Sequence, residues 1–326
     1  MHTKLLSWLL KSNSDKNLSR YIPIIAEWLA RTACINEVWV KPETYRLFQE
    51  NGFHLVRNHF YGVLPDTRNL EERWWINIPY LAPFNKINKA AVDKIFLNVL
   101  RWADELMSLP RESPKGFYWN NPMFPPLDTI ALYGMIREYR PKKILEIGSG
   151  FSTEIALLAA KHTSTTIHCI EPYPSDRLLS REAELTKLTR LPVQEVQAGV
   201  FTELQAGDFL FIDTTHTVKI GSDVNHLVFN VLPHIASGVF IHIHDIFLPY
   251  EYPKRWYDET SIFWNEQYLL LAYLLDNPTV EIVLPNYLLS IENQEFLHGR
   301  LIDFDIWGLT NNLGGASGAS MWLRKL

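Results

Sequence analysis

The sequence predicts an α/β protein built on a doubly wound, mostly parallel sheet of seven strands, the last of them antiparallel. From Pro141 onward, short apolar runs alternate with segments of helical periodicity, a pattern typical of strands joined by helices. Before about residue 125 the pattern differs, because helical segments are broken by loops rich in proline and aromatic residues. We therefore expect a mainly helical accessory cap over residues 1–125 and an α/β core over residues 126–326.

The elements of the core follow in chain order. The predicted strands are apolar runs bounded by turn residues, and they lie in residues 142–148, 165–172, 192–199 (the weakest), 207–216, 239–247, 280–289 and 318–326. The predicted helices lie in residues 152–162, 175–188, 222–235 and 260–275. Ser152 or Thr153 is placed to cap the first of these helices and Ser222 the third. In the accessory region, residues 22–32 and 90–107 have helical patterns.

Composition excludes several classes of protein. The chain has 326 residues, of which 47% are hydrophobic, and a formal net charge of −5. This charge argues against nucleic acid as the main partner, because phosphate binding needs a basic face. Two cysteines, Cys34 and Cys169, cannot build a disulfide framework and favour the reducing cytoplasm. Since no apolar run approaches the ~20 residues of a membrane span, no membrane partner is expected.

The stretch "ILEIGSGFSTEIA" contains the sharpest functional pattern. A strand ends at Glu146–Ile147, the chain turns through Gly148 and Gly150, and a helix follows. Glycines let such a turn approach a ligand closely, and the helix offers free N–H groups beside it. Glu171 ends the next strand 21 positions beyond Gly150, a spacing that suits a carboxylate bound to ribose hydroxyls. Thr153 replaces the third glycine of a dinucleotide fingerprint, and Glu146 would repel a phosphate, so a cationic nucleoside fits better.

These residues resemble motifs one and two of the class I S-adenosylmethionine-dependent methyltransferases. The resemblance implies a Rossmann-like core that binds S-adenosylmethionine, with Glu171 on the ribose. The cofactor-binding residues predicted in this way are Glu146, Gly148, Ser149, Gly150, Ser152, Thr153, Glu171, Pro172 and Asp213.

Polar residues also follow the fourth and fifth predicted strands. The fourth ends in "FIDTTH", which places Asp213 at its tip and His216 in the loop, and the fifth ends in "HIHD", with His244 and Asp245. Neighbouring strands lie about 4.8 Å apart, so Asp213 and Asp245 could share one ion. His242 faces the same side of the sheet as His244, and we expect it to be a hydrogen-bonded core residue.

The region 208–250 is similar to the metal-dependent O-methyltransferases of the macrocin (macrolide sugar) type. This resemblance implies that Asp213 and Asp245 bind Mg²⁺ or another divalent metal and that His216 is the general base. His244 stands where the family has an acid, so a metal-free site remains open, with His216 as base and Asp245 as its catalytic partner. In the metal-bound alternative, Asp213, His244 and Asp245 are the ligands.

We expect O-methylation of a small-molecule acceptor, such as a sugar, polyketide or phenol hydroxyl, by a cytoplasmic enzyme that could form a homo-oligomer. Two other functions are weighed. His216, His244 and Asp245 make the ligand set of a non-haem metal oxygenase, and the fold could also serve as a non-catalytic nucleoside-binding module. The aromatic stretch 115–128 either closes over the site or joins the cap to the core.

Overall fold

A computed structural model of the chain describes residues 21–76, 80–301 and 318–326. The chain divides into two compact units, Met1–Glu71 (unit 1) and Glu72–Leu326 (unit 2). The expected boundary near residue 125 is therefore not where the structure divides, because residues 72–125 belong to the unit that contains the sheet. The physical reason is helix α6 (Lys89–Leu100), whose buried side chains include Phe96 and Val99 of the core.

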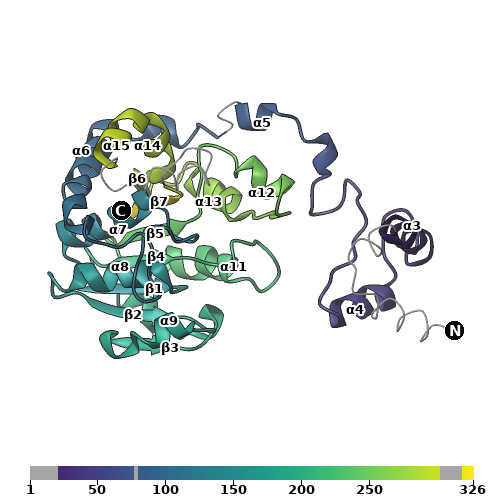
Figure 1. Ribbon diagram of the computed structural model, residues 1–326, viewed down its shortest axis with the longest axis horizontal. Coiled ribbons are helices and arrows are strands. Elements are labelled where there is room, and N and C mark those ends of the chain that lie inside the picture. The colour runs from purple at the N-terminus through teal and green to yellow at the C-terminus, as the bar shows by residue number, and fades with distance from the viewer. Residues whose placement is uncertain (1–20, 77–79, 302–317) are drawn as a thin grey trace. The chain divides into compact units, whose positions relative to one another are not determined.

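The described part of unit 1 consists of short helices joined by loops. It contains helix α3 (Ile22–Thr32), helix α4 (Pro42–Glu50) and the 3-10 helix η2 (Thr67–Asn69) (Figure 1). Pro23 lies in the first turn of α3 and Pro42 opens α4, where a missing N–H costs no hydrogen bond.

Unit 2 contains a seven-stranded sheet and the helices that cover it. Its strands are β1 (Lys143–Ile147), β2 (Thr166–Ile170), β3 (Lys187–Thr189), β4 (Phe209–Ile212), β5 (Phe240–His244), β6 (Val280–Pro285) and β7 (Ser320–Lys325). Its α-helices besides α6 are α5 (Arg73–Ile76), α7 (Pro126–Tyr139), α8 (Phe151–Ala160), α9 (Asp176–Leu179), α10 (Gly199–Thr202), α11 (Asp223–His226), α12 (Lys254–Asp258), α13 (Glu266–Leu274), α14 (Asn286–Glu292) and α15 (Gln294–Leu301). Its 3-10 helices are η3 (Phe84–Lys86), η4 (Ala103–Leu106), η5 (Glu182–Glu184), η6 (Val193–Glu195) and η8 (Leu232–His234), and η7 (Leu227–Val231) is a π-helix.

The sheet has the strand order β3-β2-β1-β4-β5-β7-β6. The first five strands in this order are parallel, and β7 runs antiparallel to both of its neighbours, which confirms the predicted doubly wound architecture. The chain reverses its direction of winding between β1 and β4, and crevices beyond the carboxyl ends of strands form at such a switch. The register pairs Ile147 with Ile212, so Gly148 and Asp213 follow on adjacent strands.

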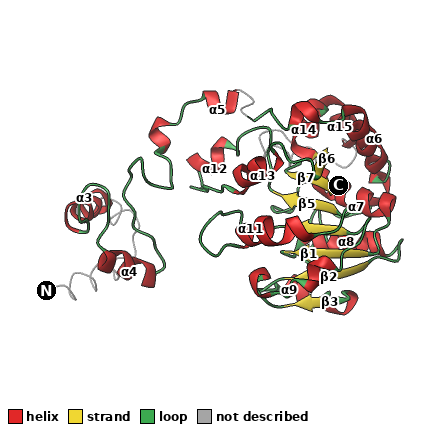
Figure 2. Ribbon diagram, turned by 180° about the vertical axis from the view of Figure 1, so that it is seen from behind, coloured by secondary structure: helices red, strands yellow, loops and turns green. Residues whose placement is uncertain are grey.

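Helices cover both faces of the sheet (Figure 2). Alternate residues of each strand point to opposite faces, so that Ile144 packs with α7 and α8 while Leu145 packs with the α10–α11 side. The first cluster also holds Phe209, Phe211 and Trp322. The two apolar layers fix the strands whose tips form the site.

Several predicted boundaries are corrected by the structure. Residues 192–199 form no strand, since Val193 and Val196 are three positions apart and suit the 3-10 turn found there. The third strand is instead β3, within the segment predicted to be the end of a long helix, and that helix is reduced to α9 and η5. Helix α8 begins one residue before Ser152, and Ser222 caps α11 by accepting from the Asn225 N–H, as predicted.

The predicted helix over 222–235 is present as consecutive α, π and 3-10 turns. The helix expected over 260–275 is shorter, because α13 begins only at Glu266. Within the described ranges, no helix has the length and apolar character needed to cross a bilayer.

Candidate active site

The turn after β1 depends on glycine at one position. Gly148 has a φ of 74°, and a Cβ added to it would overlap the backbone carbonyl oxygen of Asp213. Its N–H donates to the carbonyl of Ile170 on β2 at 3.0 Å. The turn is thus fixed between the tips of the two strands next to β1.

Glu146 holds this turn from within. Its carboxylate accepts hydrogen bonds from Ser152 Oγ at 2.6 Å, Thr153 Oγ1 at 2.7 Å and Cys169 Sγ at 3.2 Å. Because Glu146 is 1% exposed, burial raises its pKa to about 7 even though these hydrogen bonds lower it. The predicted cofactor-binding residues Glu146, Ser152 and Thr153 are thus hydrogen-bonded to one another within the turn.

Gly150 and Glu171 both lie at this turn. A Cβ added to Gly150 would meet no atom within 4 Å, so this side of the chain is open. The Gly150 N–H donates to Thr153 Oγ1 at 3.1 Å at the start of α8. Glu171 accepts from the Ser149 N–H at 3.2 Å and from the Tyr173 N–H at 2.8 Å. The structure therefore brings together the glycine turn and the acid that the sequence analysis paired, with half-buried Pro172 next to that acid.

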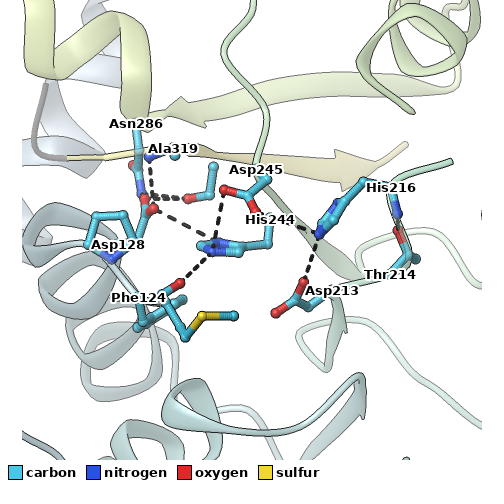
Figure 3. Close-up of polar contacts among 12 residues, drawn as sticks. Phe124, Asp128, Asp213, Thr214, His216, His244, Asp245, Asn286 and Ala319 are labelled. Atoms are coloured by element: carbon cyan, nitrogen blue, oxygen red, sulfur yellow. Dashed lines mark hydrogen bonds and ion pairs between the residues drawn. The ribbon is translucent and has the colours of Figure 1, made fainter. Parts of the chain in front are cut away.

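His216 lies between three carboxylates beyond β4. Its Nδ1 is 2.8 Å from Glu266 Oε2, and its Nε2 is 3.2 Å from Asp213 Oδ1 and 3.6 Å from Asp245 Oδ2. Figure 3 shows Asp213 and Asp245 on the same side of the imidazole ring. The predicted trio of Asp213, His216 and Asp245 is thus assembled at the adjacent tips of β4 and β5.

The loop that carries His216 is fastened to the start of α13. The His216 carbonyl accepts from the N–H groups of Asn265 and Glu266, and Thr214 Oγ1 donates to Glu266 Oε2 at 2.9 Å. These bonds hold His216 at a φ of 56°, and Asp245 has a φ of 51°. Such left-handed backbone costs non-glycine residues about 1–3 kcal/mol and clusters at functional sites.

The charges around His216 shift the pKa values of the site. Burial alone would lower the pKa of His216, but hydrogen bonds with Asp213 and Glu266 and the charges of Glu266 and Asp245 raise it well above its ordinary value. Burial in turn raises the pKa of Asp213, yet the His216 hydrogen bond and the charges of His244 and His216 outweigh it and lower that pKa. The surrounding carboxylates therefore favour the imidazolium form of His216.

The two histidines of β5 have different environments. His242 is fully buried and stacks on Phe211 with ring centroids 4.0 Å apart, so burial lowers its pKa well below the ordinary value. It is a core residue as expected, but its nitrogens have no hydrogen-bond partner within the described residues, contrary to the predicted hydrogen bonding. His244 is 2% exposed, and its Nε2 donates to the Met123 carbonyl at 3.2 Å.

A buried knot of hydrogen bonds lies behind His244 (Figure 3). Asp128 of α7 is fully buried and accepts from Asn286 Nδ2 at 2.8 Å, Ser320 Oγ at 2.6 Å and the Ala319 N–H at 2.8 Å. Its Oδ2 is 3.9 Å from His244 Nδ1. This knot joins α7, α14 and β7 to the tip of β5.

Sequence analysis missed Glu266 and Asp128. Glu266 is 50 positions from His216, and Asp128 lies near the start of a helix with no spacing that ties it to β5. Both acids lie in the first turn of a helix, but neither helix start was predicted from the sequence, and acids are common in first helical turns that have no functional role. Only the assembled fold identifies both as neighbours of the imidazoles.

The aromatic stretch before α7 packs into the core. Phe117, Trp119 and Phe124 are 2–5% exposed, and Phe124 lies against His244 with ring centroids 5.2 Å apart. Tyr118 makes an edge contact with Phe151, the first residue of α8, at 5.3 Å. Of the two expected roles, joining this segment to the core fits the three buried side chains.

The donor geometry does not form a metal centre. Across the residues that the structure describes, no group of three or more His, Cys, Asp or Glu side chains could hold a metal ion. The oxygenase-type set of His216, His244 and Asp245 is brought together, since His244 Nε2 is 3.8 Å from Asp245 Oδ1. However, His244 Nε2 already donates to a carbonyl and both His216 nitrogens face carboxylates.

A comparison with protein families matches residues 145–246, from β1 to the end of β5, to a family described as "Methyltransferase domain". This stretch, less than half of the chain, is similar to that family. An uncharacterized protein of Archaeoglobus fulgidus is 42% identical over 97 residues. This match covers 27% of the present chain and 42% of the relative, less than half of that protein's length.

Two solved structures show partial similarity to this chain. The apo-structure of CmcI-N160 is 13% identical, has a TM-score of 0.37, and the match covers 62% of this chain and 71% of that one. The plantazolicin methyltransferase BpumL in complex with SAH is 13% identical, has a TM-score of 0.30, and the match covers 76% of this chain and 94% of that one.

Proposed function

We propose that this chain is an S-adenosylmethionine-dependent methyltransferase that modifies a hydroxyl group of a small molecule, such as a sugar, a polyketide or a phenol. The observation that carries the proposal is the open space at Gly150, bordered by the start of α8 and by the fixed carboxylate of Glu171. A nucleoside fits there because the backbone approaches closely and a carboxylate can accept from two ribose hydroxyls. The match of residues 145–246 to a methyltransferase domain supports the same activity.

The residues of the turn have distinct tasks in this proposal. Glu171 would accept from the ribose, and Gly148, Ser149 and Gly150 would line the cofactor with backbone atoms, with Pro172 and Asp213 beside them. Glu146, Ser152 and Thr153 would act indirectly by holding the turn in shape. S-Adenosylmethionine supplies an electrophilic methyl group on a sulfonium when bound.

His216 would take the proton of the acceptor hydroxyl. Its Nδ1 is oriented by Glu266, which leaves Nε2 directed to the space near Asp213 and Asp245. Asp245 would hold the imidazole from the acceptor side. A general base must be unprotonated before it acts, and the raised pKa of His216 means that this form becomes more populated as pH increases.

Calorimetric titration with S-adenosylmethionine and S-adenosylhomocysteine tests the cofactor site. Glu171→Gln should weaken binding about 10- to 100-fold, since hydrogen bonds to a charged group contribute roughly 1.5–3 kcal/mol. Glu195→Gln, at an exposed acid on η6, is the matched control and should bind like the unmodified protein. His216→Ala should also keep its affinity. Equal affinity in Glu171→Gln would place the cofactor elsewhere.

Transfer of a labelled methyl group tests the reaction. The protein is incubated with methyl-labelled S-adenosylmethionine and a panel of phenols, glycosides and hydroxylated polyketides. We expect label in at least one hydroxyl acceptor, a rate that increases above pH 7, and loss of transfer in His216→Ala. Tight cofactor binding without transfer to any member of the panel would favour the non-catalytic nucleoside-binding module.

A further inference from the structure

Resemblance to metal-dependent O-methyltransferases raises the question of whether a divalent ion belongs in this crevice. Mg²⁺ takes oxygen ligands and needs near-octahedral geometry. Asp213 and Asp245 offer carboxylates at adjacent strand tips, with side chains 36% and 18% exposed. The third ligand of the implied metal site, however, is His244. Whether the three residues can bind a metal ion depends on the two nitrogens of its ring.

Neither nitrogen of His244 can serve as a ligand beside the two aspartates. Nε2 lies 3.2 Å from the Met123 carbonyl, which can only accept, so Nε2 must carry a hydrogen. Nδ1 is buried, has no hydrogen-bond partner within the described residues, and its nearest acid is Asp128 in the interior, at 3.9 Å. The ring thus presents an N–H, and no lone pair, where a metal-binding acid would present oxygen.

His216 reduces the free coordination capacity of Asp213 further. Its Nδ1 is committed to Glu266, and its Nε2 lies 3.2 Å from Asp213 Oδ1. Binding of an ion by Asp213 would compete with this contact. His216 therefore already acts as a donor toward Asp213, and the His244 ring lies 3.8–3.9 Å from the carboxylates of Asp245 and Asp128.

We propose that the crevice works without a divalent metal ion, because the imidazole rings of His216 and His244 take the place that a cation would have among the carboxylates of Asp213, Asp245 and Asp128. The inference rests on the proposed function, in that it concerns the crevice where the acceptor hydroxyl would lie. Deprotonation of the acceptor then depends on His216 alone, with Asp213 and Asp245 as hydrogen-bond acceptors. His244 is a positioning residue. In the metal-dependent enzymes that the sequence resembles, an acid stands at this position.

Metal titration of the full chain tests this inference apart from turnover. Protein treated with chelator and dialysed is titrated with MgCl₂ and MnCl₂ in a calorimeter, with and without S-adenosylhomocysteine. We expect no saturable binding in the crevice up to about 1 mM metal, the weak end of biological divalent sites. Saturable one-to-one binding that is lost in both Asp213→Asn and Asp245→Asn would overturn the proposal. Binding that survives both substitutions would lie outside the crevice and would support it.

Substitution of His244 supplies a positive test. His244→Glu should create a Mn²⁺ site, seen as saturable heat and a melting temperature that rises with added Mn²⁺. His244→Gln is the matched control, since its amide can donate to the Met123 carbonyl, and it should stay indifferent to metal. A folded His244→Glu protein that binds no Mn²⁺ would overturn the assignment to His244. If His244→Glu does not fold, the titration of the unmodified protein decides.

The same measurements separate this inference from the proposed function. Failure of S-adenosylhomocysteine to bind would contradict the methyltransferase proposal, whether or not a metal ion binds. Cofactor binding together with a crevice metal would sink only the metal-free inference.

Discussion

Gly148 and Gly150 are two positions apart, but glycine stands at these positions for different reasons. At Gly148 the backbone is left-handed and a side chain would meet the Asp213 carbonyl oxygen. At Gly150 the space that a side chain would enter is empty of protein atoms. The first glycine therefore serves the fold, while the second leaves room beside the turn.

Alanine at each position should separate these two roles. Gly148→Ala should lower the free energy of unfolding by more than about 2 kcal/mol, because left-handed strain adds to steric overlap. Gly150→Ala should change that free energy by less than about 0.5 kcal/mol, yet weaken S-adenosylmethionine binding roughly 10-fold, which corresponds to 1.4 kcal/mol. Urea denaturation and calorimetric titration measure the two effects. A Gly150→Ala protein with full affinity would show that the cofactor does not use this space.

Residues at strand tips could be located from the sequence, whereas their partners could not. Asp213, His216 and Asp245 follow apolar runs that define strands, so their meeting at one edge of the sheet follows from parallel order. Glu266 and Asp128 reach the site from helices whose placement depends on tertiary packing. The burial of Glu146 could not be predicted either, because the helix that covers its side chain is placed only by the fold.

At the scale of secondary structure, Glu146 connects three elements. It lies on β1, accepts from Ser152 and Thr153 in the first turn of α8, and accepts from Cys169 on β2. The stability of the strand-to-helix turn should therefore depend on whether the Glu146 carboxyl is protonated.

The stability of unit 2 should therefore depend on pH through Glu146. Its pKa is raised by burial from 4.5 to about 7, so the folded state binds more protons than the unfolded state between these values. Its contribution is fully present below pH 4.5 and is lost as pH rises to about 7, by an amount on the order of 3 kcal/mol. Glu146→Gln should lack this loss in urea denaturation at pH 5, 6 and 7. Glu195→Gln is the exposed control. If the free energy of unfolding of Glu146→Gln changes with pH in the same way as in the control and the unmodified protein, Glu146 is not the source of the pH dependence.

Burial explains which elements could be predicted. The runs at β1, β2, β4 and β5 are mainly apolar because helices cover the sheet on both sides, and this makes the strands recognisable in the sequence. β3 has three residues, of which Lys187 is exposed, at the sheet edge, so its pattern is weak. The helix over 222–235 was recognised from its apolar face, but periodicity does not reveal the π-turn within it.

At the scale of the whole molecule, the two units differ in their cores. Within the described part of unit 1, Ala33 is the one buried hydrophobic residue, whereas unit 2 holds two large apolar clusters. Small segments with little buried apolar surface gain little stability from their own packing. The conformational stability of the chain should reside in unit 2.

Truncation tests this division. A fragment of residues 72–326 should unfold cooperatively within about 3 °C of the full chain, since roughly 1 kcal/mol shifts the melting temperature of a domain this size by 2–4 °C. A fragment of residues 126–326, cut at the boundary suggested by sequence, should fail to fold. It lacks the buried side chains of Val92, Phe96, Val99, Leu100, Leu106, Phe117 and Trp119. Each contributes about 1.5–3 kcal/mol, so their sum of about 10–20 kcal/mol is as large as the roughly 5–15 kcal/mol by which domains are stable. Scanning calorimetry of both fragments decides, and a stable 126–326 would contradict this account.

The carboxylate of Asp128 has a consequence for the order in which the protein matures. It gathers groups that are 158 to 192 positions away along the chain and stands directly behind His244. Contacts across such separations form late, because long loops must close first. A folding intermediate in which β7 has not yet joined the sheet would already have the turn after β1. It would lack the hydrogen bonds that hold Asp128 behind His244. Competence for catalysis should then appear only in the final folding step, after the ability to retain a nucleoside.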